Sequence, residues 1–166
     1  MGFKEEKLIV KTQLRDLLSD ENVCQMREYI QHGTFTTYTH CLNVAVMSYV
    51  IATKFKVSNL CMRELLVGAM LHDFFLYDWH DGRRRPEGLH GFTHPTIALV
   101  NANKFFKLSK KEQNIIQSHM FPMTITKVPR TREAVIVCIA DKICAVQEVV
   151  SSLGINRFLE RGLKNE

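Results

Sequence analysis

LLVGAMLHDFFL, residues 65–76, is apolar on nearly every side and yet contains His72 and Asp73. A helix without a polar face is buried on most sides, so this stretch predicts a helix at the centre of a helical protein. A second apolar stretch, VIVCIADKICAV at residues 135–146, is interrupted in the same way by Asp141. An ionised carboxylate in apolar surroundings is costly without a compensating partner. We therefore expect the buried aspartates and histidines of different helices to converge on a cation.

Helical periodicity continues on both sides of these stretches. The expected helices cover residues 5–18, 21–31, 37–55, 60–76, 93–106, 110–120 and 131–152. The pattern predicts an all-α protein, a compact bundle of six to eight helices without a clear internal boundary.

Several residues indicate where these helices begin and how closely they pack. Thr36 or Thr37 and Ser109 are typical N-cap residues, and Pro95 suits the start of the helix expected over residues 93–106. Gly68 lies one turn before the His-Asp pair. Because Gly68 has no side chain, we expect another helix to approach closely at this position.

Composition narrows the class of protein. The chain has 166 residues, of which 46% are apolar and 23% charged, as in a single globular domain. No apolar run reaches the length of a membrane span, and the N-terminus, MGFKEEKLIV, lacks the apolar stretch of a signal peptide. We therefore expect a cytoplasmic protein without a membrane partner. Five cysteines without a CxxC pair argue against a disulfide framework or a cysteine-type zinc site.

The charge balance favours small anionic partners. The net charge is +5 and the isoelectric point is near 9.0, which suits nucleotides or phosphate esters. Candidate contacts to such a substrate are Arg83 and Arg84, in a polar loop over residues 78–91, together with Arg130, Arg132 and His32. The arginine run at residues 83–85 also fits a solvated loop. We expect no nucleic-acid partner.

Further histidines accompany the two apolar stretches. His40 lies on the expected third helix, His94 at the start of the fifth, and His119 on the apolar side of the sixth. Along the sequence, each of these histidines is separated from the next buried histidine or aspartate by about the length of one helical hairpin. This spacing allows each helix to bring one ligand to a common centre between packed helices.

The ordered set of His40, His72-Asp73 and Asp141 resembles the HD-domain superfamily of metal-dependent phosphohydrolases. The resemblance covers about residues 37–150, the expected core of a single HD domain over residues 1–166, with the helices at 5–31 packed on it. His94 and His119 resemble the additional ligands of two-metal members, the HD-GYP phosphodiesterases and related di-iron proteins.

The resemblance implies two divalent metal ions and a shared carboxylate. One ion would bind His40, His72, Asp73 and Asp141, and the second Asp73, His94 and His119. Imidazole and carboxylate ligands suit iron or manganese, with cobalt, nickel or zinc as further possibilities. A hydroxide activated between the ions would hydrolyse a phosphoester or phosphoanhydride of a small, nucleotide-like substrate. The implied catalytic residues are Asp73, which organises the cluster, and Lys142, a candidate phosphate contact.

The sequence also departs from the HD-GYP pattern. The lysine that these enzymes carry three residues after the doublet is replaced by Leu76, and the GYP tripeptide is absent, so hydrolysis of cyclic di-GMP is not expected. Two alternatives stay open, a di-iron oxygenase of the same fold and a non-catalytic HD binding module. A homo-oligomer is also possible through apolar residues such as Leu153, Ile155 and Phe158.

Overall fold

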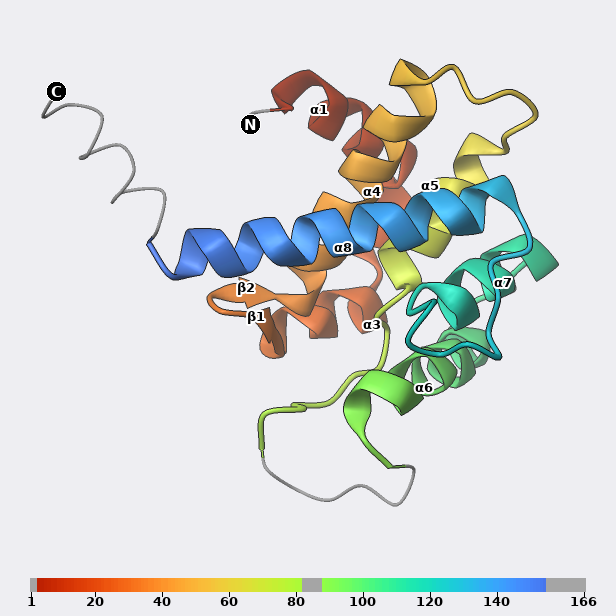
Figure 1. The fold of residues 1–166 in the computed structure, drawn as a ribbon. Helices are drawn as coiled ribbons and strands as arrows, with labels where there is room; N and C mark the ends of the chain where they lie inside the picture. The colour runs from red at the N-terminus through yellow and green to blue at the C-terminus, as the bar shows by residue number, and fades with distance from the viewer. Residues whose placement is uncertain (1–2, 82–87, 155–166) are drawn as a thin grey trace, which may run out of the picture.

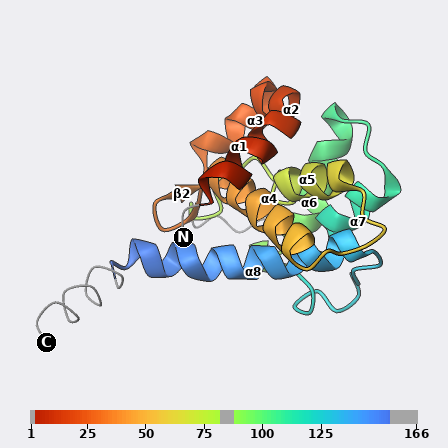
Figure 2. The ribbon, with the colours of Figure 1, turned by 90° about the horizontal axis from the view of Figure 1, so that it is seen from above.

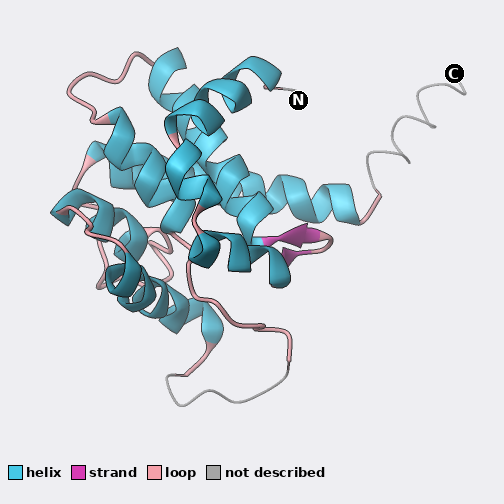
Figure 3. Ribbon diagram, turned by 180° about the vertical axis from the view of Figure 1, so that it is seen from behind, coloured by secondary structure: helices cyan, strands magenta, loops and turns pink. Residues whose placement is uncertain are grey.

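The computed structural model describes residues 3–81 and 88–154. Within these ranges the chain forms eight α-helices, one 3-10 helix and a two-stranded hairpin, which confirms the all-α class (Figures 1 and 3). The helices are α1 (Lys4–Gln13), α2 (Arg15–Ser19), α3 (Glu21–Cys24), the 3-10 helix η1 (Gln25–Glu28), α4 (Thr37–Lys54), α5 (Met62–Leu71), α6 (His90–Phe105), α7 (Lys110–Ser118) and α8 (Arg132–Ser152), and the strands are β1 (Ile30–His32) and β2 (Phe35–Thr36).

Helices α4, α5 and α8 form the centre of the bundle. Helix α4 crosses both α5 and α8, while α6 and α7 pack on one another beside α5 (Figures 1 and 2). As the sequence predicts, α5 is the most deeply buried helix, with every residue from Leu65 to Leu71 in the interior. Its apolar side chains join one core with Val10 and Leu14 from the N-terminal region.

Gly68 allows the predicted close approach of another helix. A Cβ atom at this position would lie only 2.6–2.9 Å from three atoms of the Ile115 side chain on α7. The absence of a side chain therefore brings α5 and α7 together, and with them the residues that follow the C-termini of these two helices.

The N-cap predictions are confirmed at two helices. Thr36 caps α4 by accepting a hydrogen bond from the backbone N–H of Thr39, and Ser109 forms a reciprocal capping box with Glu112 on α7. All five cysteines are free thiols. None of the described helices combines the length and the apolar character needed to cross a bilayer.

The predicted helix over residues 21–31 is wrong in its second half. Asp20 caps a single α-helical turn, which continues as η1 and then as the β1–β2 hairpin. Tertiary contacts account for the change. A Cβ atom on Gly33 in the hairpin turn would overlap the side chain of Ser152 on α8, and Thr37 donates its backbone N–H to Tyr29 O at 2.8 Å.

Several predicted helix boundaries are also corrected. The expected helix over 5–18 divides at Leu14, α5 ends at Leu71 rather than Leu76, and α7 ends at Ser118. Helix α6 begins at His90, so Pro95 lies inside the helix rather than in its first turn. Apolar periodicity shows which residues face the core, but it does not fix the residue at which a helix begins or ends.

Candidate metal centre

Six predicted ligands from five segments come together in the interior. His40 lies on α4, His94 on α6 and Asp141 on α8, while His72-Asp73 and His119 directly follow the ends of α5 and α7. Their exposed fractions lie between 0 and 7%. A buried group of four imidazoles and two carboxylates is therefore the main polar feature of the core.

One part of this cluster, the first group, consists of His40, His72 and Asp141. Oδ1 of Asp141 lies 3.1 Å from His40 Nε2 and 3.6 Å from His72 Nε2. Oδ2 of Asp73 lies 3.4 Å from His72 Nε2 and 3.8 Å from His40 Nε2. The two carboxylates thus face the same pair of imidazoles.

The second group consists of His94 and His119 and faces the other oxygen of Asp73. Oδ1 of Asp73 lies 3.2 Å from His94 Nε2 and 3.4 Å from His119 Nε2. The two Nε2 atoms are 2.8 Å apart. The carboxylate of Asp73 therefore lies between the groups, with one oxygen directed to each.

The four imidazoles share one orientation. Their Nδ1 atoms bond to an outer acceptor, namely Glu148 Oε2 for His40 (2.8 Å), Ala69 O for His72 (2.7 Å), His90 O for His94 (2.7 Å) and Ile116 O for His119 (2.8 Å). Since each acceptor requires an N–H on Nδ1, the lone pair of each neutral ring is on Nε2 and points to the centre. Outer partners of this kind fix the tautomer of histidines that bind metal ions.

The cluster fits a pair of divalent cations. His72 Nε2 and Asp73 Oδ1 are buried and have no hydrogen-bond partner among the described residues. Two Nε2 lone pairs that face each other at 2.8 Å repel unless a proton or a cation lies beside them. Two sets of three residues offer ligand atoms that lie within 4.8 Å of one another in each set, namely His40-His72-Asp141 and His72-Asp73-His119. This mixture of imidazole and carboxylate suits iron, manganese, cobalt, nickel or zinc.

The electrostatics of the cluster couple metal binding to protons. Burial disfavours the charged form of His40, but hydrogen bonds to Asp141 and Glu148 outweigh burial and raise its pKa to about 10. Burial also raises the pKa of Asp73, yet the neighbouring His72, His94 and His119 together outweigh burial and hold that pKa well below its usual range. Near neutral pH Asp73 is thus ionised and His40 is protonated, so a cation that binds here displaces protons.

Three further residues complete the surroundings of the cluster and were not predicted from the sequence. Glu148 accepts from His40 with one carboxylate oxygen and, with the other, from Asn43 Nδ2 at 2.9 Å. Gln31 donates from Nε2 to Asp73 Oδ2 at 2.6 Å. Glu148 lies two turns after Asp141 on the buried face of α8, a spacing that could have revealed it, whereas no local signal marks Gln31.

A cavity of about 550 Å³ opens beside the second group. Its polar lining includes both aspartates, the second group, Gln31 and His32. The ring of His32 meets the ring of His40 edge-on, with centroids 5.1 Å apart, and burial lowers the pKa of His32. His32 thus lies at the cavity, where the sequence predicts a substrate contact.

Stacked rings form one wall of this cavity. The ring of His90 stacks on that of His94 with centroids 4.5 Å apart, and the indole of Trp79 stacks on His90 at 4.8 Å. The hydroxyl of Tyr77 lies 2.8 Å from His90 Nδ1. Apolar side chains complete the lining, from Met120, Pro122, Met123 and Ala145.

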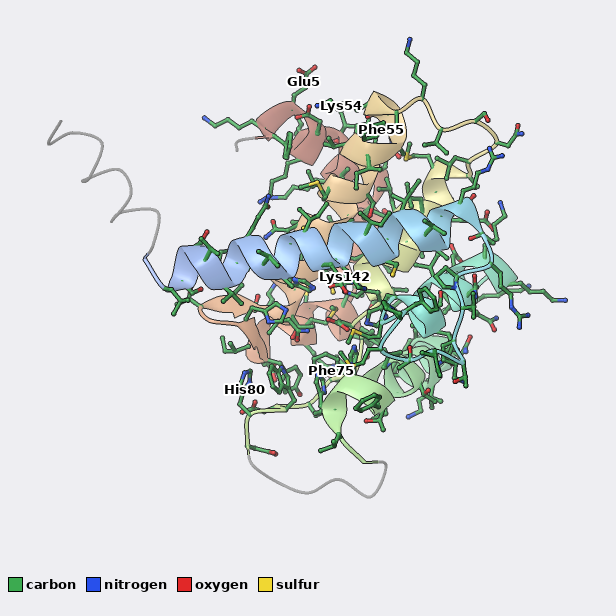
Figure 4. All side chains as sticks on the ribbon, viewed as in Figure 1. Glu5, Lys54, Phe55, Phe75, His80 and Lys142 are labelled. Carbon is green, nitrogen blue, oxygen red and sulfur yellow. The ribbon has the colours of Figure 1, made fainter. Side chains whose placement is uncertain are left out.

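Lys142 lines the cavity but is already well bonded. Its Nζ donates to His119 O at 3.0 Å, to Cys138 O at 3.2 Å and to Cys138 Sγ at 3.3 Å, which ties α8 to the end of α7 (Figure 4). An ammonium group has three donors, and these contacts use all of them. A contact between Lys142 and phosphate stays a prediction.

The predicted arginine contacts lie elsewhere or outside the described residues. Arg130 is exposed and is not among the described residues that line the cavity. Arg132 donates to Ser58 O at 2.7 Å and to Ser58 Oγ at 3.0 Å, which ties the start of α8 to the α4–α5 loop. Arg83 and Arg84 fall in the range 82–87, outside the described residues.

A family model described as HD domain matches residues 37–146. This range contains all six clustered residues and most of the helical core. Neither the curated proteins nor the solved structures give a significant match. The HD-domain superfamily consists mostly of metal-dependent phosphohydrolases. The matched range spans well over half of the chain, and the chain therefore belongs to the HD domain family.

Proposed function

We propose that this chain is a two-metal phosphohydrolase that acts on a small phosphoester or phosphoanhydride. The observation that carries the proposal is the placement of Asp73, whose two oxygens face two separate groups of imidazole donors. A single-metal site needs no second group of histidines on the far oxygen of the same carboxylate. Asp73 would bridge the two cations, His40, His72 and Asp141 would complete one site, and His94 and His119 the other.

Two divalent cations at this position would lower the pKa of a water molecule and neutralise charge on phosphoryl oxygens. The chain itself supplies the geometry. Ala69 O and Ile116 O orient His72 and His119 through their Nδ1 atoms, and Glu148 orients His40. Because the cluster is buried, the surrounding low-polarity core strengthens each of these interactions.

The cavity supports a substrate with a compact organic part attached to phosphate. A volume of about 550 Å³ lies within the range of small-molecule sites. Its apolar and aromatic wall suits the ring of a nucleoside. Asp73, His94 and His119, which would hold the cations, line the part of the same cavity where the phosphate would bind. A nucleoside monophosphate fits this division between an apolar wall and a polar floor.

The proposal is tested with protein loaded with Mn²⁺ or Fe²⁺ and a panel of nucleoside mono-, di- and triphosphates and simple aryl phosphates. We expect phosphate release that depends on the added metal and that Asp73→Ala abolishes. Consumption of dioxygen without phosphate release, measured with the Fe²⁺-loaded protein, would assign the oxygenase chemistry instead. A protein that binds both cations and shows neither reaction would favour a binding module.

A further inference from the structure

Among the described residues outside the six ligands, Gln31 has a polar side chain that touches the carboxylate of Asp73 and also lines the cavity. It lies on β1, is 5% exposed, and donates from Nε2 to Asp73 Oδ2 at 2.6 Å. An ionised carboxylate only accepts hydrogen bonds, so the amide nitrogen must face Asp73. The carbonyl oxygen of Gln31 is therefore directed away from Asp73.

That carbonyl oxygen, Oε1, is buried and has no hydrogen-bond partner among the described residues. Leaving a buried acceptor without a partner is costly, because the oxygen loses its hydrogen bonds to water without replacement. The hydroxyl oxygen of Ser48 is also buried and has no hydrogen-bond partner among the described residues. Ser48 lies on α4, however, and is not among the described residues that line the cavity. Gln31 differs because its surroundings include the cavity, from which a ligand or water can supply the missing donor.

The strand that carries Gln31 is held at both ends. Before it, Tyr29 O accepts hydrogen bonds from the backbone N–H and the hydroxyl of Thr37 at the start of α4. After it, Gly33 lies against Ser152 of α8 so closely that a side chain would not fit. A residue that is anchored in this way keeps its amide in one place relative to Asp73, as a group that orients a reactant must.

We propose that Gln31 is a catalytic residue that orients the attacking water while it holds Asp73 in its bridging position. Its Oε1 accepts a hydrogen bond from the water, and its Nε2 donates to Asp73 Oδ2. In a phosphomonoester the water oxygen forms the new bond to phosphorus, and the ester P–O bond breaks with its electron pair on the leaving oxygen. The net transfer of one proton from water to that oxygen yields an alcohol and phosphate. Gln31 does not take the proton, because an amide is not basic. This inference rests on the proposed function.

The test compares Gln31→Met, which keeps the size of the side chain and removes both polar contacts, with the wild type and with the control Ser48→Ala. Thermal unfolding checks that each variant is folded. Calorimetry gives the affinity for Mn²⁺ and, in the Mn²⁺-loaded protein, the affinities for phosphate and for orthovanadate, which adopts the five-coordinate geometry of the attack. Steady-state kinetics at saturating Mn²⁺ gives kcat and KM on the best substrate of the panel.

For Gln31→Met we expect a fall in kcat of about 10²–10³-fold with KM changed by less than about threefold, the signature of a group that acts in the transition state. Mn²⁺ affinity should fall about tenfold because Asp73 loses its outer partner. Orthovanadate affinity should fall at least about tenfold more than phosphate affinity. Ser48→Ala should match the wild type. Gln31→Glu keeps an acceptor oxygen but replaces the amide donor with a second carboxylate against Asp73, so it should not recover the lost kcat.

Three results would overturn the inference. One is a kcat of Gln31→Met that is within threefold (about the error of such comparisons) of the wild type. Another is an equal loss of phosphate and orthovanadate affinity, which would make Gln31 a contact to the phosphoryl group. The third is a wild type that hydrolyses no phosphoester, which would refute the proposed function as well. An active wild type matched by Gln31→Met refutes the inference alone.

Discussion

The two groups of imidazoles in the cluster are held by different parts of the fold. In the first group, His40 and Asp141 lie within the long helices α4 and α8, and the buried carboxylate of Glu148 supports His40. In the second group, His94 bonds to a carbonyl in the first turn of α6, and His119 follows the end of α7. His40 and Asp141 therefore depend on charge and on long helices, whereas both histidines of the second group, and His72 of the first, bond to backbone carbonyls near helix ends.

The two groups also differ in their access to the cavity. Both histidines of the second group line it, whereas the first group contributes only Asp141. This difference suggests a division of labour, in which a tightly bound cation at the first group supports the fold and a more exchangeable cation at the second group meets the substrate. Variants in each group, and the pH dependence of metal binding, test that division.

Asp73→Ala should remove both cations, because each group shares one oxygen of this carboxylate. We expect phosphate release to fall by more than about 10³-fold. Without the cations the attacking water is no longer activated, and the charge on the phosphoryl oxygens is no longer neutralised. Elemental analysis after dialysis measures the metal content. Asp16→Ala, at an exposed aspartate on α2, is the control and should keep both cations. Retention of either cation by the Asp73 variant would contradict the bridging role.

Asp141→Ala and His119→Ala compare the two groups directly. Loss of His119 should remove the second cation and leave the first, because His40, His72, Asp73 and Asp141 stay in place. Loss of Asp141 should lower the affinity for the cation at the first group, where we expect the tighter binding. Metal titration followed by calorimetry resolves the two binding steps. The division fails if His119→Ala loses both cations.

Glu148→Gln should lower the affinity for the cation at the first group and leave the affinity of the second group unchanged. The change removes the charge that supports the Nδ1–H of His40, and replacement of such an outer partner typically costs about 10–100-fold in metal affinity. The neighbouring exposed residue on α8 provides the control, Gln147→Ala, which should bind metal as the wild type does. An equal weakening of both cations would show that Glu148 does not distinguish the groups.

Metal affinity should rise with pH between pH 6 and 8. The hydrogen bonds to Asp141 and Glu148 overcome burial and raise the pKa of His40 to about 10, so this imidazole is protonated throughout the range when no cation is bound. Binding displaces at least one proton, which increases affinity about tenfold per pH unit for each proton released. Calorimetry in two buffers of different ionisation enthalpy counts these protons. A pH-independent affinity would contradict the electrostatics described above.

Gly68→Ala should have the smallest effect on chemistry and a clear effect on stability. The new methyl group would overlap the Ile115 side chain, and overpacking of this kind costs about 1–3 kcal/mol of the free energy of unfolding. Denaturant unfolding of the metal-free protein measures the loss. Adding Ile115→Val, which removes one of the overlapping carbons, should recover part of it. Additive losses in the double variant would argue against a direct contact.

Much of the fold was predictable because local chemistry specifies it. The apolar surround of His72-Asp73 predicts a central helix, Ser109 and Thr36 mark helix starts, and Gly68 marks a close approach. The hairpin after Glu28 was missed because its geometry depends on contacts with α4 and α8. Those contacts are distant in sequence and leave no periodic pattern.

The candidate site was predictable to a similar extent. His72, Asp73 and Asp141 interrupt apolar stretches, and their cost of burial makes them visible in the sequence. His40, His94 and His119 were predicted from their helical positions, their spacing and the family resemblance. Glu148 follows Asp141 by two turns of α8 and could have been found from that spacing, whereas Gln31 touches Asp73 only through the tertiary fold and has no local signal. The predicted arginine contacts rested on charge alone, and Arg132 instead ties two segments of the fold together.

Anomalous diffraction from crystals of the Mn²⁺-loaded protein would locate both cations relative to Asp73. We expect two peaks per chain, one between Asp73 and the first group and the other between Asp73 and the second group. A single peak, or peaks away from Asp73, would contradict a two-metal centre bridged by this carboxylate.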